Sequence, residues 1–187
     1  MQAVTDEQLI DWVAKGDASC LGTLFERHHK AVYRYCLQIT HNAAQAEDLT
    51  QDVFLRLLKK SASFAGRGSF KAWMFNIARN VALDYLRKAK RRDETELDEA
   101  MDGMIENRSA EQGASGKQGM AALTRALAKL PAELREVIWL GRFEFDSYEE
   151  LGAALGCKAA TARVRMHRAM QRLNAEFTAI NGAPINE

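Results

Sequence analysis

The side chains best suited to binding an anionic partner lie near the end of the chain, where basic residues are spaced along one predicted helix. Five basic residues and no acidic residue occur from Lys158 to Arg172. At about 100° per residue, one narrow stripe of this helix is apolar and faces away from the basic side chains. The apolar stripe contains Ala162, Met166, Ala169 and Leu173, and the opposite face contains Ala160, Arg163, Val164 and His167. A helix with an apolar back and a cationic front fits the major groove of DNA.

Aromatic and basic residues also occur together in the middle of the chain, from Phe64 to Tyr85. Rings beside cations can hold unpaired nucleotides, because bases stack on the rings while the cations neutralise phosphates. An extruded base also needs a hydrogen-bonding group at its edge. Phe64 in a loop and Asn80 on a helix could supply the ring and the amide, with Trp73 as a second candidate ring. The remaining aromatic residues of the segment are expected in the core: Phe70, Phe75 and Tyr85.

Catalytic chemistry is not indicated. The histidines lack the spacing of a metalloprotease site, and the glycines form no phosphate-binding loop. The three cysteines, Cys20, Cys36 and Cys157, are too widely spaced for a zinc site or a disulfide framework. We therefore expect a protein that is not an enzyme, needs neither metal nor cofactor, and keeps its thiols reduced.

Composition agrees with a helical protein of the cytoplasm. The chain of 187 residues can hold one or two compact domains. Its stretches rich in Ala, Leu, Arg, Glu and Lys favour an all-α fold. No apolar run approaches the length of about 20 residues that a membrane span needs. Because the N-terminus also carries no secretion signal, we expect a cytoplasmic protein without membrane insertion.

The aromatic and basic residues must be positioned by helices, and two of these are predicted before residue 41. Thr5 and Gln8 can form a capping box for a short helix through Ala14. Asp17 can then cap a second helix that continues to about residue 40. The inner side of the second helix is expected to hold Leu21, Phe25, Val32, Cys36 and Ile39.

A helix predicted from 43 to 60 has an unusual outer face. Its inward stripe contains Ala46, Leu49, Val53 and Leu57, with Phe54 beside it. Its outer face contains Asp48, Gln51, Leu55 and Lys59, with Leu58 nearby. An apolar residue such as Leu55, ringed by polar ones, often marks a partner surface. Single exposed leucines are also normal, so periodicity alone leaves both interpretations open.

The next helix leads into a reversal of charge. A loop follows, because Gly66 and Gly68 interrupt any helix there. The next helix is predicted from about 69 to 92 and is strongly basic at its end. From 93 to 118, eight acidic residues occur with two basic ones, and apolar periodicity is lost. This composition is typical of a flexible tether; an irregular loop packed on one domain is the alternative. We therefore predict domains at 1–92 and 119–187, joined by an acidic linker at 93–118.

The C-terminal basic helix belongs to a predicted helix-turn-helix. Ser147 and Glu150 fit a capping box for a preceding helix. Gly156 can end that helix in the left-handed conformation, and the basic helix then runs to about Phe177. Upstream helices are predicted from 119 to 130 and from 131 to 143. A solvated basic helix is the alternative interpretation of the arginines alone.

Four segments, in this order and spacing, resemble the extracytoplasmic-function sigma factors of the sigma-70 family. Their sequences are AEDLTQDVFLRLLKK, FKAWMFNIARNVALDYLRKAKRR, LPAELREVIWLGRF and SYEELGAALGCKAATARVRMHRA. The resemblance covers nearly the whole chain apart from the spacer and the last few residues. It implies a promoter-specificity subunit of bacterial RNA polymerase, with sigma domain 2 and sigma domain 4 joined by a linker.

For the first domain, the resemblance implies contacts with the polymerase and with melted promoter DNA. The segment from 46 to 60 would bind the coiled coil of the β′ clamp. The residues expected in that contact are Asp48, Gln51, Asp52, Leu55 and Leu58. The following loop and helix would read the −10 element as a single strand and hold an extruded base. The residues expected in that role are Phe64, Trp73, Asn80, Arg87, Lys88 and Arg91.

For the second domain, the resemblance implies reading of the −35 element as duplex and contact with the β flap. The residues expected at the DNA are Lys158, Thr161, Arg163, Val164, Arg165, His167 and Arg168. The chain departs from many family members at Lys158, Ala160 and Ala162, where proline, glycine and valine are usual. Because of these departures, the −35 sequence that the helix reads is undetermined. The expected insertion of the helix into the major groove is not affected. The family also implies a separate anti-sigma protein as a partner.

Two other functions are compatible with the same helices. A stand-alone helix-turn-helix repressor or activator would bind a paired operator as a dimer and without polymerase. An adaptor that binds only polymerase would tolerate the loss of Arg163 and Arg168. Specific duplex binding that is indifferent to core polymerase would identify the first alternative.

Overall fold

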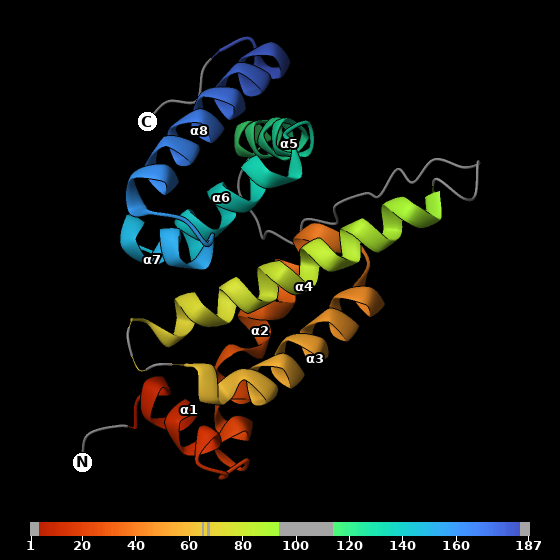
Figure 1. Ribbon diagram of the computed structural model, residues 1–187. Helices are drawn as coiled ribbons and strands as arrows, with labels where there is room; N and C mark the ends of the chain where they lie inside the picture. Colours follow the sequence, from red (N-terminus) through yellow and green to blue (C-terminus); the bar gives the residue numbers. More distant parts are fainter. Residues whose placement is uncertain (1–3, 65, 67, 94–113, 184–187) are drawn as a thin grey trace. The chain divides into compact units, whose positions relative to one another are not determined.

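The computed structural model describes residues 4–64, 66, 68–93 and 114–183, and every regular element within these ranges is helical (Figure 1). The elements are α1 (Asp6–Ala14), α2 (Cys20–Thr40), α3 (Ala43–Lys60), the 3₁₀ turn η1 (Ser61–Ser63), α4 (Phe70–Asp93), α5 (Ala114–Ala128), α6 (Ala132–Phe143), α7 (Tyr148–Ala154) and α8 (Ala159–Asn181). The first compact unit contains α1 to α4, and the second contains α5, α6, α8 and most of α7. The predicted all-α fold with two helical domains is confirmed. Most of the predicted linker, residues 94–113, lies outside the described residues.

Local sequence signals explain where the helices of the first unit begin. Thr5 and Gln8 form the predicted capping box, in which the Thr5 hydroxyl accepts from the Gln8 N–H at 3.3 Å. Asn42 caps α3 through a backbone N–H in its first turn at 3.1 Å. The prediction that Asp17 caps α2 is wrong. Its carboxylate accepts from the N–H of Ser19 at 3.1 Å, which forms a turn before α2 rather than a cap on it.

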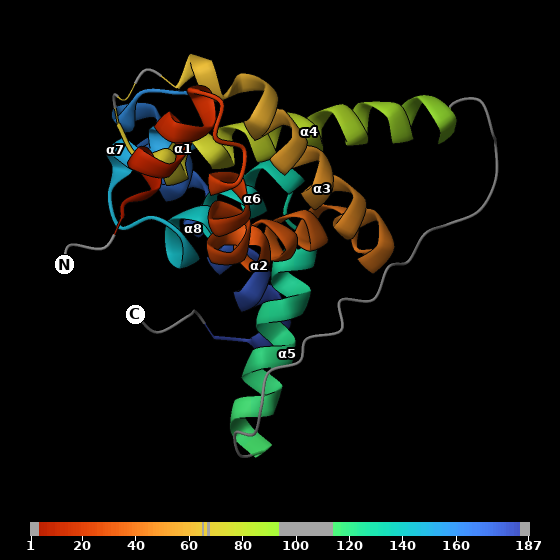
Figure 2. The same ribbon diagram turned by 90° about the horizontal axis from the view of Figure 1, so that it is seen from below.

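The core of the first unit lies where α2, α3 and α4 pack together, and the last turns of α4 extend beyond the start of α3 (Figures 1 and 2). The predicted inward stripe of α3 is buried, as are Phe70 and Phe75 of α4. Phe25 was expected on the inner side of α2, but it is 40% exposed. The reason is that Phe25 lies at the rim, stacked on His29 and against the edge of Phe54.

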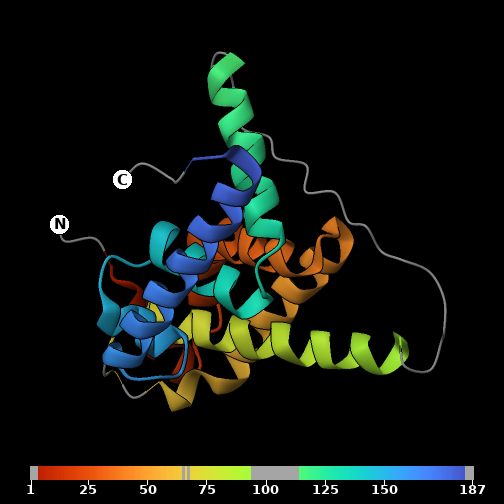
Figure 3. The ribbon, with the colours of Figure 1, turned by 90° about the horizontal axis from the view of Figure 1, so that it is seen from above.

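In the second unit, α8 packs against α5 and α6 (Figure 3). The predicted stripe of Ala162, Met166, Ala169 and Leu173 is buried in this contact. Helix α5 begins at Ala114 rather than at Gly119, because an isolated glycine costs a helix only about 1 kcal/mol and does not by itself stop it. At the other end of α5, the Arg135 guanidinium donates to the carbonyl of Ala128 at 3.1 Å.

Helices α7 and α8 form the predicted helix-turn-helix. The Ser147 hydroxyl accepts from the N–H of Glu150 at 3.2 Å, which caps α7. Gly156 has φ 65° and ends that helix in the left-handed region. Gly152 lies against the turn, because a Cβ atom there would stand 2.8 Å from the carbonyl oxygen of Cys157. The turn is therefore tight and depends on a small residue in α7.

Candidate nucleic-acid interfaces

Helix α8 presents the basic face that the sequence predicts. Val164 is 50% exposed on the side opposite the buried stripe. The exposed predicted residues are Lys158, Thr161, Arg163, Val164, His167 and Arg168, and Arg165 is half-buried. Lys158 is the N-cap of α8, so its ammonium group adds to the positive end of the helix dipole.

Much of this positive charge is not compensated by carboxylates. Arg172 pairs with Glu176 at 2.9 Å, and Lys129, which directly follows α5, lies 3.8 Å from the same carboxyl group. In the part of the chain that the structure describes, no ion pair neutralises Arg163 or Arg168. These two guanidinium groups are available to phosphates and to the acceptor atoms of bases.

Arg163 is oriented by a contact across the turn. Its guanidinium carbon lies 5.1 Å from the centroid of the Tyr148 ring, at the start of α7. Such a cation–π contact restricts where the guanidinium can point. Tyr148 was not among the predicted site residues, because no periodic pattern relates a ring in one helix to a cation in the next.

In the first unit, an aromatic cluster forms where the loop after η1 meets α4. The ring centroids of Phe64 and Trp73 are 5.2 Å apart. The ring centroid of Phe70 lies 6.2 Å from that of Phe64 and 6.1 Å from that of Trp73. Phe70 is buried, whereas Phe64 and Trp73 are half-buried. The cluster therefore offers two partly accessible rings, supported by a third, for stacking with unpaired bases.

The other predicted single-strand contacts follow one face of α4. Asn80 is exposed and lies about two helical turns, or roughly 10 Å along the axis, beyond Trp73. Its amide donates to the Asn76 side chain at 3.4 Å. Arg87, Lys88 and Arg91 are exposed farther along the helix. The predicted residues thus form a stripe that begins at the rings and ends in cations, rather than one closed pocket.

An ion-pair network joins this stripe to α3. Asp84 is the lone acidic residue between 71 and 92. Its carboxylate accepts from Arg56 of α3 at 3.0 Å and lies 3.6 Å from Arg87. The Tyr85 hydroxyl also donates to the side chain of Gln45 in α3. Arg56 was not among the predicted site residues, because charge pairing between two helices leaves no spacing signal.

The outer face of α3 carries the predicted polymerase-docking residues. Asp48, Gln51 and Asp52 are exposed, and Leu55 is 53% exposed among them. Leu58 lies at the edge of this face and is 37% exposed. An accessible leucine surrounded by polar and acidic side chains suits a protein partner that offers apolar and basic groups.

A groove of about 680 Å³ lies between α2 and α3, beside this face. Its lining residues are Phe25, His29, Lys30, Tyr33, Arg34, Glu47, Thr50 and Gln51. Gln51 belongs both to the groove and to the outer face of α3. The second unit has an exposed aromatic surface of its own, because Phe143 is 72% exposed and its ring lies 6.1 Å from that of Trp139.

The cysteines Cys20, Cys36 and Cys157 are free thiols. Burial raises the pKa of the Cys36 thiol to about 12, which makes this group a poor nucleophile at neutral pH. Among the described residues, no cluster of His, Cys, Asp or Glu could hold a metal ion. None of the described helices has the length and apolarity to cross a bilayer.

Family comparison matches both units. A family model described as Sigma-70 region 2 matches residues 24–92, and one described as Sigma-70, region 4 matches residues 120–173. Together these matches cover more than half of the chain. Helix α1 lies outside both of them.

Named relatives agree with the family models. The chain is 35% identical over 164 residues to the ECF RNA polymerase sigma factor SigE of Mycolicibacterium smegmatis, a match that covers 86% of this chain and 63% of that protein. The chain thus spans less than two thirds of SigE. It is 25% identical over 177 residues to the RNA polymerase sigma-H factor of Pseudomonas aeruginosa, covering 90% of this chain and 92% of that one.

Two solved structures have a similar fold. One is CnrH in complex with the cytosolic domain of CnrY, with a TM-score of 0.67, 25% identity, and coverage of 93% of this chain and 97% of that chain. The other is the sigma factor RpoE in complex with the anti-sigma factor NepR from Bartonella quintana. Its TM-score is 0.68 at 28% identity, and the match covers 86% of this chain and 97% of that chain.

Proposed function

The chain belongs to the sigma-70 family as an extracytoplasmic-function sigma factor, and from this premise we propose that it binds core RNA polymerase and starts transcription at specific promoters. The observation that carries the proposal is the presence of three chemically different exposed surfaces. These are the basic face of α8, the aromatic and basic stripe of α4, and the apolar and acidic face of α3. Each suits a different contact of a promoter-bound polymerase.

The face of α8 reads the −35 element as duplex DNA. Arginine can donate two hydrogen bonds to guanine, and a valine side chain can contact the methyl group of thymine. Arg163, Arg168 and Val164 supply these groups on one exposed surface, and the position of Lys158 favours a phosphate at the start of the helix.

The stripe of α4 reads the −10 element as a melted strand. Phe64 and Trp73 provide stacking surfaces, and the exposed amide of Asn80 can bond to the edge of a base. Arg87, Lys88 and Arg91 then attract the phosphates that follow. The distance of about two helical turns between Trp73 and Asn80 supports contacts to more than one nucleotide.

The outer face of α3 binds the coiled coil of the polymerase β′ clamp, with Leu55 at the centre and Asp48, Gln51 and Asp52 around it. An anti-sigma protein is the second partner of this region. The neighbouring groove between α2 and α3 supports that assignment, because it adds aromatic and charged surface beside Leu55.

In the second unit, exposed Phe143 is an apolar contact for the β flap.

Division of recognition between two units has a physical logic. Each unit offers few contacts to DNA, so its own affinity is weak and falls with salt. Once both units are held on the polymerase, the second DNA contact becomes effectively intramolecular and gains from local concentration. Promoter recognition therefore depends on the core enzyme.

Run-off transcription tests the proposal directly. Purified bacterial core polymerase and the full chain are incubated with a library of genomic fragments, and transcript starts are sequenced. We expect starts at defined sites that share two sequence elements at a fixed spacing. Arg163→Ala combined with Arg168→Ala should reduce these starts. Arg172→Ala is the matched control, because Arg172 is paired with Glu176.

The competing function is that of a stand-alone helix-turn-helix regulator. A gel shift with and without core polymerase separates the two. Specific duplex binding by the free chain, unchanged by polymerase, would favour the regulator. Failure to copurify with core enzyme and to direct defined starts would reject the proposed function.

A further inference from the structure

We propose that Glu7 is a positioning residue for single-strand recognition, which fixes the start of α4 and with it the rings of Phe64 and Trp73. The inference rests on the proposed −10 role of these rings. Glu7 belongs to α1, which precedes the residues matched by the region 2 model.

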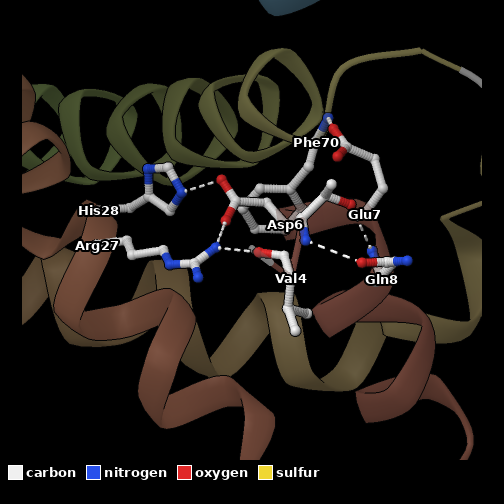
Figure 4. Close-up of polar contacts among 8 residues, drawn as sticks. Val4, Asp6, Glu7, Gln8, Arg27, His28 and Phe70 are labelled. Carbon is white, nitrogen blue, oxygen red and sulfur yellow. Dashed lines mark hydrogen bonds and ion pairs between the residues drawn. The ribbon is translucent and has the colours of Figure 1, made fainter. Parts of the chain in front are cut away.

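The Glu7 carboxylate caps a helix that is distant in sequence. Its Oε1 accepts from the backbone N–H of Phe70, the first residue of α4, at 3.0 Å (Figure 4). The local cap is weaker, because the Ser69 hydroxyl accepts from the N–H of Ala72 at 3.4 Å. A carboxylate at this place satisfies an orphan N–H group and interacts favourably with the helix dipole.

Helix α1 is itself held in place, so Glu7 is a fixed anchor. Asp6 lies between two residues of α2, with its oxygens 2.6 Å from both Arg27 and His28 (Figure 4). Arg27 also donates to the carbonyl of Val4 at 3.0 Å. The side of α1 that carries Asp6 also contains the buried residues Leu9, Ile10 and Val13. Adjacent carboxylates therefore tie α2 and α4 to the same short helix.

The position of Phe70 determines the geometry of the aromatic cluster. Its ring is fully buried and contacts the rings of His28, Phe64 and Trp73, with centroids 5.6, 6.2 and 6.1 Å away. The segment before it contains Gly66 at φ 63° and Gly68 at φ 94°, a left-handed conformation that glycine adopts at little cost. Without the contact to Glu7, the first turn of α4 frays and the stacking surfaces lose their fixed spacing. Binding then requires ordering at the moment of recognition.

The test measures base discrimination by the assembled holoenzyme. The probe is the strongest promoter fragment that the unmodified protein selects in run-off transcription, together with versions in which single −10 bases are replaced. Open-complex formation is compared between the original and replaced bases. For Glu7→Ala we expect the discrimination ratio to fall by about tenfold, the effect of losing one hydrogen bond to a charged group. The Glu7→Gln variant should keep most of the discrimination ratio, because the glutamine amide oxygen can still accept from the N–H of Phe70.

Asp11→Ala is the matched control. Asp11 is an exposed carboxylate of the same helix and pairs with Lys15, the C-cap residue of α1, so its removal should leave the ratio unchanged. If Glu7 had a purely structural role, its loss would lower the fraction of active protein but would leave the discrimination ratio unchanged. That result overturns the inference. If Glu7→Ala does not fold, Glu7→Asp shortens the side chain while keeping its charge, and an unchanged ratio there is equally decisive. Absence of defined starts with the unmodified protein would instead reject the proposed function.

Discussion

The guanidinium of Arg56 lies 3.0 Å from a carboxylate oxygen of Asp84, and this ion pair joins α3 to the aromatic and basic stripe of α4. The carboxylate is also 3.6 Å from Arg87. The Asp84 side chain is 42% exposed, so the pair contributes at most about 1 kcal/mol to the free energy of unfolding. Its larger effect is on charge, because the Asp84 carboxylate partly offsets both Arg56 of α3 and Arg87 of the stripe.

Asp84→Asn should therefore strengthen DNA binding without a large change in stability. Arg56 and Arg87 become available to phosphates, and each additional phosphate contact steepens the salt dependence by about 0.7 for a single strand. Fluorescence anisotropy with a labelled oligothymidine at several salt concentrations measures this slope. Asp11→Asn removes the same charge from α1 and should leave the slope unchanged. Equal slopes for both variants would contradict the assignment.

Leu55→Arg should abolish binding to core polymerase while the protein stays folded. Leu55 is 53% exposed, so substitution there changes the free energy of unfolding by about 0.5 kcal/mol or less. Copurification with core enzyme measures binding, and urea denaturation measures stability. Leu57, two residues on and fully buried, is the contrasting position. Leu57→Ala should destabilise the first unit by about 2–5 kcal/mol. Normal polymerase binding by Leu55→Arg would argue against the docking face.

The outer and inner faces of α3 illustrate how far sequence periodicity reaches. It predicted the buried stripe of α3 and the exposure of Leu55, because both depend only on the angle per residue within one helix. Phe25 was misplaced for a related reason. Periodicity gives the direction of a side chain but not the edge of the neighbouring helix, and Phe25 lies at the rim beside Phe54.

Helical periodicity could not predict the contacts between side chains of different helices. Glu7 and Phe70 are far apart in the chain, and nothing in their spacing indicates that a carboxylate in α1 caps α4. The contact of Arg163 with Tyr148 likewise depends on the path of the turn. The basic face of α8, the aromatic residues near Phe64 and the outer face of α3 could thus be predicted as separate patterns. The contacts that fix their side chains could be identified only from the fold.

Arg163→Lys tests whether Arg163 reads a base or only attracts phosphate. Lysine keeps the positive charge but loses the planar fork that bonds to guanine. We expect initiation at the selected promoter to fall by about tenfold, with a smaller effect on promoters altered at the contacted base pair. Tyr148→Phe keeps the ring under the guanidinium and should behave as the unmodified protein. A uniform loss on all promoters would indicate a phosphate contact instead.

The same substitution at two glycines should have opposite effects on the second unit. A Cβ atom at Gly152 would lie 2.8 Å from the carbonyl oxygen of Cys157 and 3.1 Å from the backbone nitrogen of Ala159, whereas nothing lies within 4 Å of a Cβ atom at Gly119. Backbone atoms cannot move aside as a flexible side chain can. Gly152→Ala should therefore destabilise the second unit by about 1–3 kcal/mol, and Gly119→Ala should stabilise it by up to about 1 kcal/mol.

Hydrogen exchange of α8 amides, measured by mass spectrometry on the full chain, reports these changes locally. Faster exchange in Gly152→Ala should accompany weaker promoter-specific initiation, because the turn sets the position of α8 relative to α7. Gly119→Ala should slow exchange and leave initiation unchanged. If Gly152→Ala exchanged at the rate of the unmodified protein, the close approach of α7 to the turn would not constrain the position of α8.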